Sequence, residues 1–390
     1  MYDKNTVEKA LNLHHATYGS RPTAVAYAPG RIEVLGNHTD YNEGTVLSAA
    51  INMGHCFCIS AGTEPGITLT AGDLGETISF NLESNQRLDK NVQWANYVKG
   101  VMFYLHEQGI EIDSINCTFF GSIPLGAGLS SSAALEVATA YAVLEYTGKT
   151  LDNNAIGILC QAAENKFAGC NCGLLDQFSS IFGVHHGMIH SDFRTLATYP
   201  VKLPDDVVFL MINPHIKHAL ADSPYNERRI SCEKAAETLD SLLAQPVRAL
   251  RDVSWDEFSY LRDKLDIEGA SRAAHIIGEI TRVEQSVELL KSNHLEDFGQ
   301  LMFDSHESSR TQFENSCEEL DIVVETARAA GALGARLSGG GWGGSVVALV
   351  HATDAETICD KIIKSCNAKG LQPTAEIIVP SSGAIVIKQD

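Results

Sequence analysis

The stretch from Pro124 to Ala134 has the residue types of a backbone cradle for phosphate. It reads Pro-Leu-Gly-Ala-Gly-Leu-Ser-Ser-Ser-Ala-Ala, and its two glycines lack the Cβ that would block a close ligand. Residues 115–120 before it alternate apolar and polar like a strand, and 133–146 after it carry apolar residues at helical spacing. Because free N–H groups at a helix start attract phosphate, the stretch predicts an anion site.

The three consecutive serines of this stretch add hydroxyl groups to the cradle. We expect one of Ser130, Ser131 and Ser132 to cap the following helix, which leaves a second hydroxyl free for a magnesium ion. A plain glycine turn into a core helix is the competing interpretation, and the serine run favours the phosphate site. The stretch is not the common nucleotide loop that ends in Gly-Lys-Ser/Thr, because the one such tripeptide, 148–150, has Val143 at the first glycine position.

The segment 29–44 is the second group of residues with potential chemistry. Short apolar pieces and three glycines separate its polar side chains: Arg31, Glu33, His38, Asp40, Asn42 and Glu43. A surface loop is not expected to alternate charged residues with Ile32, Val34 and Leu35. We therefore interpret the segment as semi-buried backbone that hydrogen-bonds a polyhydroxyl ligand.

A third glycine-rich stretch, 337–350, formally contains Gly-x-Gly-x-x-Gly at Gly339, Gly341 and Gly344. A dinucleotide fold needs a helix after these glycines, whereas β-branched residues follow here. The stretch is therefore not interpreted as a dinucleotide site.

The elements that must position these residues follow from apolar periodicity. We expect helices at 5–18, 94–104, 133–146, 155–167, 226–243, 255–265, 270–292, 295–309 and 320–330, with strands at 23–28, 46–59, 67–82, 115–120, 207–212, 337–350 and 374–379. The helix at 94–104 has an aromatic stripe, for which core packing is the default explanation.

The length of 390 residues exceeds what one ordinary core holds, so we expect two domains, 1–200 and 201–390. Two prolines, Pro200 and Pro204, mark the boundary. The net charge of −20 argues against a nucleic acid or an anionic membrane as partner, because either needs a basic face. Small molecules are the expected partners, and the protein is expected to be a monomer.

The first residues, 1–19, carry charge where a secretion signal needs an apolar run, and no stretch reaches membrane-spanning length. The ten cysteines are scattered without a Cys-x-x-Cys pair, so a zinc site is not expected. Reduced and mostly buried thiols in the cytoplasm are the favoured interpretation.

Taken together, these motifs resemble those of the galactokinases, a branch of the GHMP small-molecule kinases, from about Ala28 to the C-terminus. Three motifs stand in the family's order: 30–42, 124–134 and 334–344. The run His-Thr-Asp-Tyr-Asn at 38–42 and the run Cys-Gly-Leu-Leu-Asp-Gln-Phe at 172–178 are similar to signatures of the sugar-kinase branch. The resemblance implies a two-domain α+β fold, with ATP and sugar bound in the cleft between the domains.

The resemblance also implies a reaction, in which the γ-phosphate of ATP passes to the anomeric hydroxyl of galactose or a close relative. It implies roles residue by residue. The catalytic pair would be Asp176 and Arg31. The sugar contacts would be Asn37, His38, Asp40, Gly173 and Tyr225. The ATP contacts would be Trp94, Pro124, Gly126, Ala127, Gly128, Leu129, Ser130, Ser131, Ser132 and Ala133. The magnesium ligands would be Ser132 and Glu164.

The residue types suit this chemistry independently of the resemblance. A sugar hydroxyl that attacks phosphorus must lose its proton, and the charge on the transferred group must be neutralised, which Asp176, Arg31 and Mg²⁺ would supply. A nearby guanidinium makes a carboxylate a weaker base. We therefore expect Asp176 mainly to orient the hydroxyl and to take its proton late.

Position 37 departs from the family pattern. Galactokinases have Glu where this chain has Asn37, and usually Asn where this chain has Glu33. In the family that glutamate holds the C6 hydroxyl of the sugar. The expected substrate is therefore galactose or a C6 variant of it, with galacturonate as the alternative.

Two further classes compete with a galactose kinase. A non-catalytic galactose sensor would keep the fold, but such relatives depart from the pattern after the loop serines, whereas 132–134 are intact here. A GHMP enzyme for mevalonate, homoserine or a heptose is opposed by the runs 38–42 and 225–229, which fall where galactokinases contact sugar.

Overall fold

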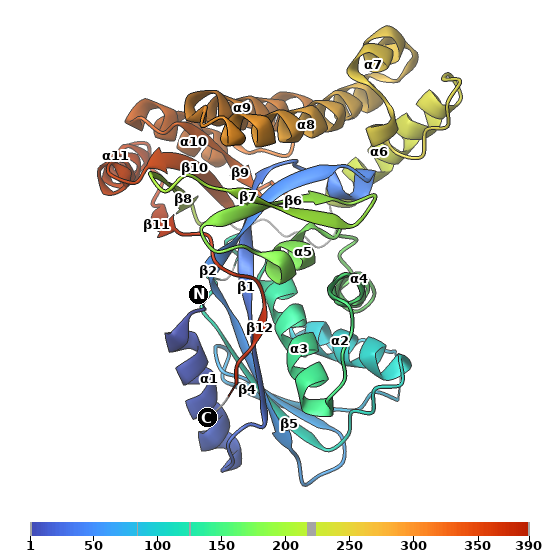
Figure 1. The fold of residues 1–390 in the computed structure, drawn as a ribbon, viewed down its shortest axis with the longest axis vertical. Coiled ribbons are helices and arrows are strands. Elements are labelled where there is room, and N and C mark those ends of the chain that lie inside the picture. The colour runs from blue at the N-terminus through green and yellow to red at the C-terminus, as the bar shows by residue number, and fades with distance from the viewer. Residues whose placement is uncertain (1, 84, 125, 217–223, 389–390) are drawn as a thin grey trace.

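Two sheets organise the protein, whose computed structural model describes residues 2–83, 85–124, 126–216 and 224–388 (Figure 1). The larger sheet has eight strands, with the order β12-β1-β2-β5-β3-β4 and the β6-β7 pair attached to β2. The smaller sheet has four strands in the order β11-β8-β10-β9. Helices cover both sheets, so the expected mixture of helices and strands in an α+β fold is confirmed.

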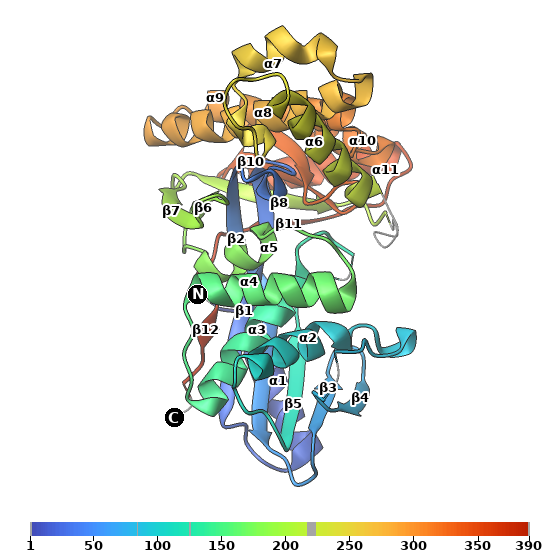
Figure 2. The same cartoon turned by 90° about the vertical axis from the view of Figure 1, so that its right-hand side faces the viewer.

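The longest strands, β1 (Ala24–Leu35) and β2 (Thr45–Ala61), form an antiparallel pair that runs between the two halves of the molecule (Figures 1 and 2). Every residue of β1 is buried. The pairing is irregular between Pro29 and Arg31 and again between Glu33 and Leu35, whereas 31–33 pair regularly with 48–50. Bulges of this kind redirect side chains near functional sites.

The remaining strands of the larger sheet lie on both sides of this pair. Strand β5 (Ile115–Gly121) pairs with β2 and also, in parallel, with β3 (Ile67–Ala71), whose hairpin partner is β4 (Glu76–Phe80). Strands β6 (Gly187–Asp192) and β7 (Ala197–Lys202) extend the other end of β2. The short β12 (Ile385–Val386) pairs with β1.

Helices cover both faces of the larger sheet. Helix α1 (Lys4–Tyr18) packs on one face against β2 and β5. Helices α2 (Ala95–Glu107), α3 (Ser131–Thr147), α4 (Asn153–Ala163) and α5 (Leu175–Phe182) gather on the other face, where Figure 2 shows them layered in front of the strands. Helix α3 contacts both β1 and β2, so its first turn lies beside the functional segments of β1.

The smaller sheet and its helices form the upper part of Figure 1. The sheet consists of β8 (Val207–Asn213), β9 (Gly334–Ser338), β10 (Ser345–His351) and β11 (Thr374–Ile378). The helices are α6 (Pro224–Asp240), α7 (Trp255–Leu261), α8 (Ile267–Lys291), α9 (Leu295–Ser308), α10 (Glu318–Ala330) and α11 (Ala355–Ala368). Helices α8 and α9 pack over the upper parts of β1 and β2, which joins the two halves through one apolar core.

Most of the predicted elements are confirmed within one to a few residues, and three are wrong. Residues 337–350 are not one strand but the end of β9, a glycine-rich loop and β10, because Gly339, Gly341 and Gly344 have positive φ values. The strand predicted at 23–28 continues to Leu35. Residues 67–82 form a hairpin, not one strand, because the chain turns at Gly75, where φ is +68°. The predicted helix 155–167 ends its α-helical part at Ala163 and continues as the π-helical turn η3 (Glu164–Ala168). Strands β6 and β7 and helix α11 were not predicted.

The chain changes from the larger to the smaller sheet between β7 and β8, at residues 203–206. This change supports a domain boundary near the two prolines, which we keep as a proposal. The final residues return to the larger sheet as β12.

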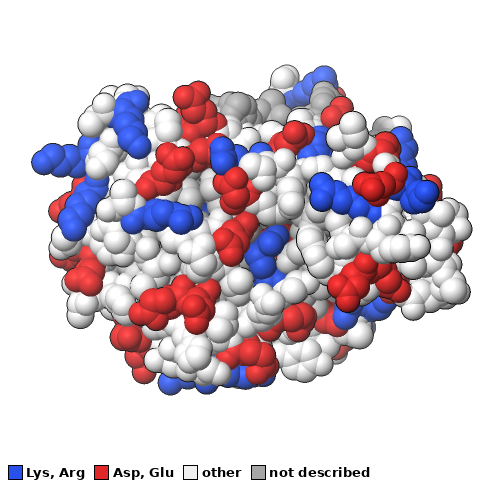
Figure 3. All heavy atoms as spheres, turned by 90° about the horizontal axis from the view of Figure 1, so that it is seen from above, with Lys and Arg blue, Asp and Glu red and all other residues white. Residues whose placement is uncertain are grey.

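The surface mixes charges of both signs. Figure 3 shows Lys and Arg side chains interspersed with Asp and Glu on the face seen from above. All ten cysteines are free, and six of them are buried. Across the part of the chain that the structure describes, no helix combines the length and the apolar character needed to cross a membrane.

Candidate active site

A cavity of about 410 Å³ brings together the three segments that the sequence analysis singled out. It is lined by residues of β1 and the loop after it, by residues 124 and 126–130 with the first turn of α3, and by residues between 170 and 176 before and within α5. Tyr225 of α6 and Gly339 and Gly340 after β9 complete its wall from the other half of the molecule. The cavity therefore lies between the two sheets, as expected.

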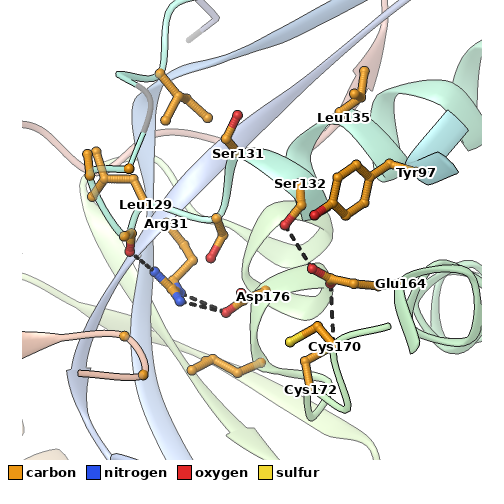
Figure 4. Close-up of a pocket in the computed structure, with 18 of the residues that line it drawn as sticks. Arg31, Tyr97, Leu129, Ser131, Ser132, Leu135, Glu164, Cys170, Cys172 and Asp176 are labelled. Carbon is orange, nitrogen blue, oxygen red and sulfur yellow. Dashed lines mark hydrogen bonds and ion pairs between the residues drawn. The ribbon is translucent and has the colours of Figure 1, made fainter. Parts of the chain in front are cut away.

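Arg31 and Asp176 form an ion pair in the middle of this cavity (Figure 4). Nε and Nη2 of Arg31 lie 2.9 and 2.8 Å from the same carboxylate oxygen of Asp176. The guanidinium is almost fully buried, whereas the carboxylate keeps 23% of its side-chain surface exposed. Asp176 can therefore contact a ligand while Arg31 holds it in place.

Arg31 also contacts the glycine-rich loop. Its Nη1 donates a hydrogen bond of 2.6 Å to the carbonyl oxygen of Gly128, and its backbone N–H donates to the carbonyl of Leu129. One side chain of β1 thus ties the loop to the carboxylate of α5. Arg31 makes these contacts from a strand that is buried throughout.

The glycine-rich loop turns as predicted. Gly126 and Gly128 have φ values of +72° and +70°, which other residues rarely adopt. The predicted serine cap of α3 is wrong, because Ser130 sits at the N-cap position with φ +57° and its hydroxyl makes no cap hydrogen bond. Ser131 Oγ instead lies 2.8 Å from His55 Nε2, and Ser132 Oγ donates to Glu164.

The missing cap leaves the first N–H groups of a 17-residue helix available to a ligand. The hydroxyl of Ser130 is buried and has no partner among the described residues. An orphaned hydroxyl beside uncapped N–H groups suits an anion with several acceptor oxygens, such as a phosphate. The remaining loop residues hold the loop in place: Ala127 and Leu129 are buried with their carbonyls bonded to Ser345 and Arg31, Pro124 accepts from Ala127, and Ala133 is buried inside α3.

Glu164 lies beside Ser132 at the start of η3 (Figure 4). Its Oε1 accepts from Ser132 Oγ at 2.9 Å, and its Oε2 accepts from Gln177 and from the thiol of Cys172. Burial, and then the neighbouring Asp176, raise the pKa of Glu164. The predicted magnesium ligands are therefore adjacent hard oxygens, which are the donors that Mg²⁺ prefers.

No cluster of three or more His, Cys, Asp or Glu side chains suited to a metal is found among the residues that the structure describes. A magnesium ion at Ser132 and Glu164 would therefore need phosphate oxygens and water as its further ligands. That is the usual situation for Mg²⁺ in phosphate-transferring sites.

Asp40 and Gly173 meet in the wall of the cavity. A Cβ at Gly173 would lie 1.8 Å from Asp40 Oδ2, so only glycine fits there. Asp40 also accepts from the N–H groups of Leu175 and Tyr41. Burial, and then the charge of Asp176, raise the pKa of Asp40 to about 6.

His38 and Tyr225 pack together in this region, with ring centroids 4.9 Å apart. The His38 nitrogens are already bonded, Nδ1 to the Tyr41 hydroxyl and Nε2 to the carbonyl of Gly340. Burial lowers the pKa of His38 to about 4, so the ring is neutral. His38 is placed at the predicted sugar site as a wall residue, and its ring nitrogens are not free to bind.

Asn37 lines the same region but is fully buried. It contacts Glu33, two residues beyond Arg31 on β1, which in turn is paired with the buried Arg336 of β9. The sequence pointed to position 37 as the unusual one. The partnership with Arg336 was not predicted, although Arg336 stands inside the third family motif.

Trp94 immediately precedes α2 and also lines the cavity. Its ring packs on Phe119 of the larger core, and its Nε1 donates a 2.7 Å hydrogen bond to Glu76. The core packing expected of the aromatic stripe is therefore observed, and the predicted contact of Trp94 with adenine stays a prediction. Tyr97, one turn later on α2, lines the same cavity and was not predicted, although it belongs to that stripe.

Comparison with known proteins places this geometry in a family. Residues 96–184 match the model of the GHMP kinases N terminal domain, 286–368 match the GHMP kinases C terminal model, and 12–61 match the galactokinase galactose-binding signature. Galactokinases of Pasteurella multocida and Haemophilus influenzae (strain PittGG) are each 36% identical to this chain. The alignments cover 97% and 98% of this chain and 99% of each relative.

Solved structures agree with these matches. The structure titled Lactococcus lactis galactokinase complexed with galactose superposes with a TM-score of 0.90 at 30% identity, covering 96% of this chain and 98% of that one. The mevalonate kinase of Methanococcus jannaschii shares the fold, with a TM-score of 0.64 at 18% identity over 94% of this chain and 100% of that one.

Proposed function

The chain belongs to the galactokinase family of the GHMP kinases, and we propose that it transfers the γ-phosphoryl group of ATP to the C1 hydroxyl of galactose. Full-length identity of 36% to galactokinases is the observation that carries this proposal. The products are galactose 1-phosphate and ADP. The geometry of the cavity then suggests how the residues divide the work.

Asp176 and Arg31 would act on the reacting groups. The part-exposed carboxylate of Asp176 is placed to accept a hydrogen bond from the attacking hydroxyl and to take its proton. Arg31 fixes that carboxylate and places positive charge beside the loop carbonyl of Gly128, next to the expected phosphate site. Positioning and electrostatic stabilisation would supply most of the rate, as in other phosphoryl transfers.

The sugar would lie at the end of the cavity formed by Asp40 and Gly173, beside the rings of His38 and Tyr225. Asp40 is an acceptor for sugar hydroxyls when it is ionised. Gly173 keeps the neighbouring backbone close to Asp40 because it lacks a Cβ.

ATP would lie at the other end, with its phosphates on the loop 126–130 and on the uncapped N-terminus of α3. Its base would lie near Trp94 and Tyr97. Mg²⁺ at Ser132 and Glu164 would neutralise phosphate charge during the transfer.

The alternatives kept open by the sequence are less well supported. The sensor is disfavoured because full-length relatives are kinases and because Arg31, Asp176 and the loop are assembled. Galacturonate is disfavoured because the buried cavity wall presents the carboxylate of Glu33, which repels a second carboxylate.

We further propose a monomeric, cytoplasmic protein without a nucleic-acid partner. Ten unpaired thiols favour a reducing compartment, and a net charge of −20 disfavours polyanions. Size-exclusion chromatography with light scattering tests the monomer.

A coupled ADP-release assay tests the main proposal with galactose, galacturonate, 6-deoxygalactose, glucose and mevalonate as acceptors. We expect galactose to have the highest kcat/KM, with phosphorus NMR locating the phosphate on C1. Turnover of mevalonate or galacturonate in preference to galactose would overturn the proposal.

A further inference from the structure

Asn37 has no hydrogen-bonding capacity left for a ligand. Both hydrogens of its Nδ2 are used, in bonds of 2.9 Å to Glu33 Oε1 and 2.8 Å to the carbonyl of Gly339. Its Oδ1 accepts from Asn315 Nδ2 at 2.7 Å and from Ser309 Oγ at 3.4 Å. An amide offers two donors and two acceptor lone pairs, so all four are occupied. The expectation that Asn37 itself meets the sugar is therefore not supported by the geometry.

Glu33 can still accept a hydrogen bond from a ligand, whereas Asn37 cannot. Its Oε1 accepts two hydrogen bonds, from Asn37 Nδ2 and from Arg336 Nη1, each 2.9 Å long. Its Oε2 accepts none from the described residues, and the side chain lines the cavity. Glu33 is thus a buried carboxylate with one oxygen anchored and one oxygen free.

The anchoring of Glu33 is strong on both sides. Arg336 is fully buried, and Glu33 is the carboxylate that hydrogen-bonds it. The backbone N–H of Glu33 donates to Ser338 Oγ at 2.8 Å, which fixes β1 against β9. A buried charge held by an ion pair and a neighbouring amide keeps one orientation, so its free oxygen points in a defined direction.

We infer that Glu33 is a specificity-determining residue whose Oε2 accepts a hydrogen bond from a hydroxyl of the sugar, and that Asn37 is a positioning residue that orients Glu33. This inference rests on the proposed function, since it names a contact of the same sugar site. Sugar recognition in this chain then depends on an ion pair, Glu33–Arg336, that joins the two sheets. It also predicts discrimination against sugars that carry a carboxylate at the contacted position.

The test combines variants with deoxygenated substrates. Wild type, Glu33→Gln, Glu33→Asp and the control Glu43→Gln are assayed with galactose and with its 2-, 3-, 4- and 6-deoxy analogues. Glu43 is a matched control because it is an ion-paired glutamate of the same segment that does not line the cavity. We expect Glu33→Gln to raise the KM for galactose and to lower kcat/KM about ten- to a hundred-fold, as when a charged acceptor is lost. The KM for ATP should not change.

This series should identify the hydroxyl that Glu33 contacts. If the missing hydroxyl is the one that Glu33 contacts, wild type should have a kcat/KM for that deoxy analogue as low as the kcat/KM of Glu33→Gln for galactose. Glu33→Gln assayed with that analogue should then show little further loss of kcat/KM. Equal, additive losses for all analogues would overturn the inference. Glu33→Asp keeps the negative charge beside Arg336 but moves the carboxylate away from the cavity. It therefore replaces Glu33→Gln in the test if Glu33→Gln does not fold.

Asn37→Ala tests the positioning role. Its effect on kcat/KM should be smaller than that of Glu33→Gln and should vanish when Glu33 is already replaced. An Asn37→Ala effect that persists in the double variant would show that Asn37 contacts the sugar itself. A wild-type protein inactive on galactose would instead contradict the proposed function, which separates the two failures.

Discussion

The guanidinium of Arg31 is the group on which both ends of the site depend, because it bonds the loop carbonyl of Gly128 and the carboxylate of Asp176 together. The carboxylate is held but not enclosed, with 23% of its side chain exposed. On the proposed function, Asp176 is therefore held by Arg31 in the orientation in which it would meet the incoming hydroxyl.

Replacing Asp176 with Asn should remove proton acceptance while keeping a polar group of the same size. We expect kcat to fall by ~10²–10⁴ and the affinity for galactose to stay within a few-fold. Steady-state kinetics and isothermal titration calorimetry measure the two quantities, and the thermal unfolding midpoint controls for folding. A variant that kept more than about a tenth of the wild-type kcat would exclude Asp176 as the proton acceptor.

We expect Asp40 to make the affinity for galactose depend on pH. Burial, and then Asp176, raise its pKa to about 6. The folded protein therefore binds the carboxyl proton of Asp40 more tightly than the unfolded chain does. The stability that this proton contributes is present at low pH and is lost as the pH rises through about 6. Ionised Asp40 is the better acceptor, so galactose binding should weaken as pH falls below about 6.

Calorimetric titration of galactose across this pH window tests the role of Asp40, with Asp40→Asn as the comparison. The variant should bind more weakly, and its affinity should not change through the window. A wild-type affinity that stays constant as the pH falls would show that Asp40 does not bind the sugar as a carboxylate.

At the scale of elements, the glycine loop and the start of α3 form the proposed phosphate site, and the two glycines of the loop are not equivalent. We expect a side chain at Gly128 to meet the phosphates, and its Cβ would also lie 3.3 Å from the backbone of Gly344. A Cβ at Gly126 meets no atom within 4 Å among the described residues. Gly128 therefore packs the loop against the third motif, and Gly126 faces open space.

The pair Gly126→Ala and Gly128→Ala separates these roles. Both variants force alanine to adopt positive φ, which costs on the order of 1 kcal/mol each. Gly128→Ala should lower the unfolding midpoint further, because Gly344 must also shift. Thermal unfolding and the KM for ATP are the measurements. Equal unfolding midpoints for the two variants would mean that Gly344 can shift away from the added Cβ without a loss of stability.

The sequence predicted the elements with strong periodicity better than the loops and caps. Helix α3 and strand β5 were found because apolar spacing alone defines them. The hairpin of β3 and β4 was missed although Gly72, Asp73 and Gly75 mark its turn. The serine cap failed because Ser131 and Ser132 bond partners far along the chain, His55 and Glu164. Tertiary partners of this kind leave no local signal.

Contacts between residues far apart in the sequence also limited the prediction of the site. Arg31, Asp40, Gly173 and Asp176 were singled out by motif, and they line one cavity. The role of Glu33 could not be read from the sequence, because it depends on Arg336, 303 positions away. Only the folded chain shows which member of the pair Glu33 and Asn37 has a free oxygen.

At the scale of the whole molecule, β12 ties the last described residues to the first sheet. Ile385 and Val386 pair with Tyr27 and Ala26, and the Ile387 N–H donates to Val25. Ile385 and Ile387 also pack on a small core of α1 and β1. Edge pairing of this kind covers a strand that would otherwise be open.

Ending the chain after Gly383 should therefore lower the unfolding midpoint by several degrees, since it exposes the buried ring of Tyr27 and unpairs the edge of β1. Differential scanning calorimetry measures this shift. Ile377→Ala, at an exposed position of β11, is the control and should leave the midpoint unchanged. A shortened chain as stable as the full chain would show that β12 is dispensable.

The regular stretch of β1 between its two bulges has a consequence for the size of the substrate. Arg31 and Glu33 lie two residues apart on one extended backbone, so their α-carbons are separated by roughly 6.6 Å whatever the two halves of the molecule do. If the sugar binds as proposed, the residues at its reacting end and at its recognised end are held at a fixed separation by one strand, and this separation does not depend on the closing of a cleft. The preference for six-membered over five-membered sugar rings should therefore persist in variants whose two halves move more freely relative to each other.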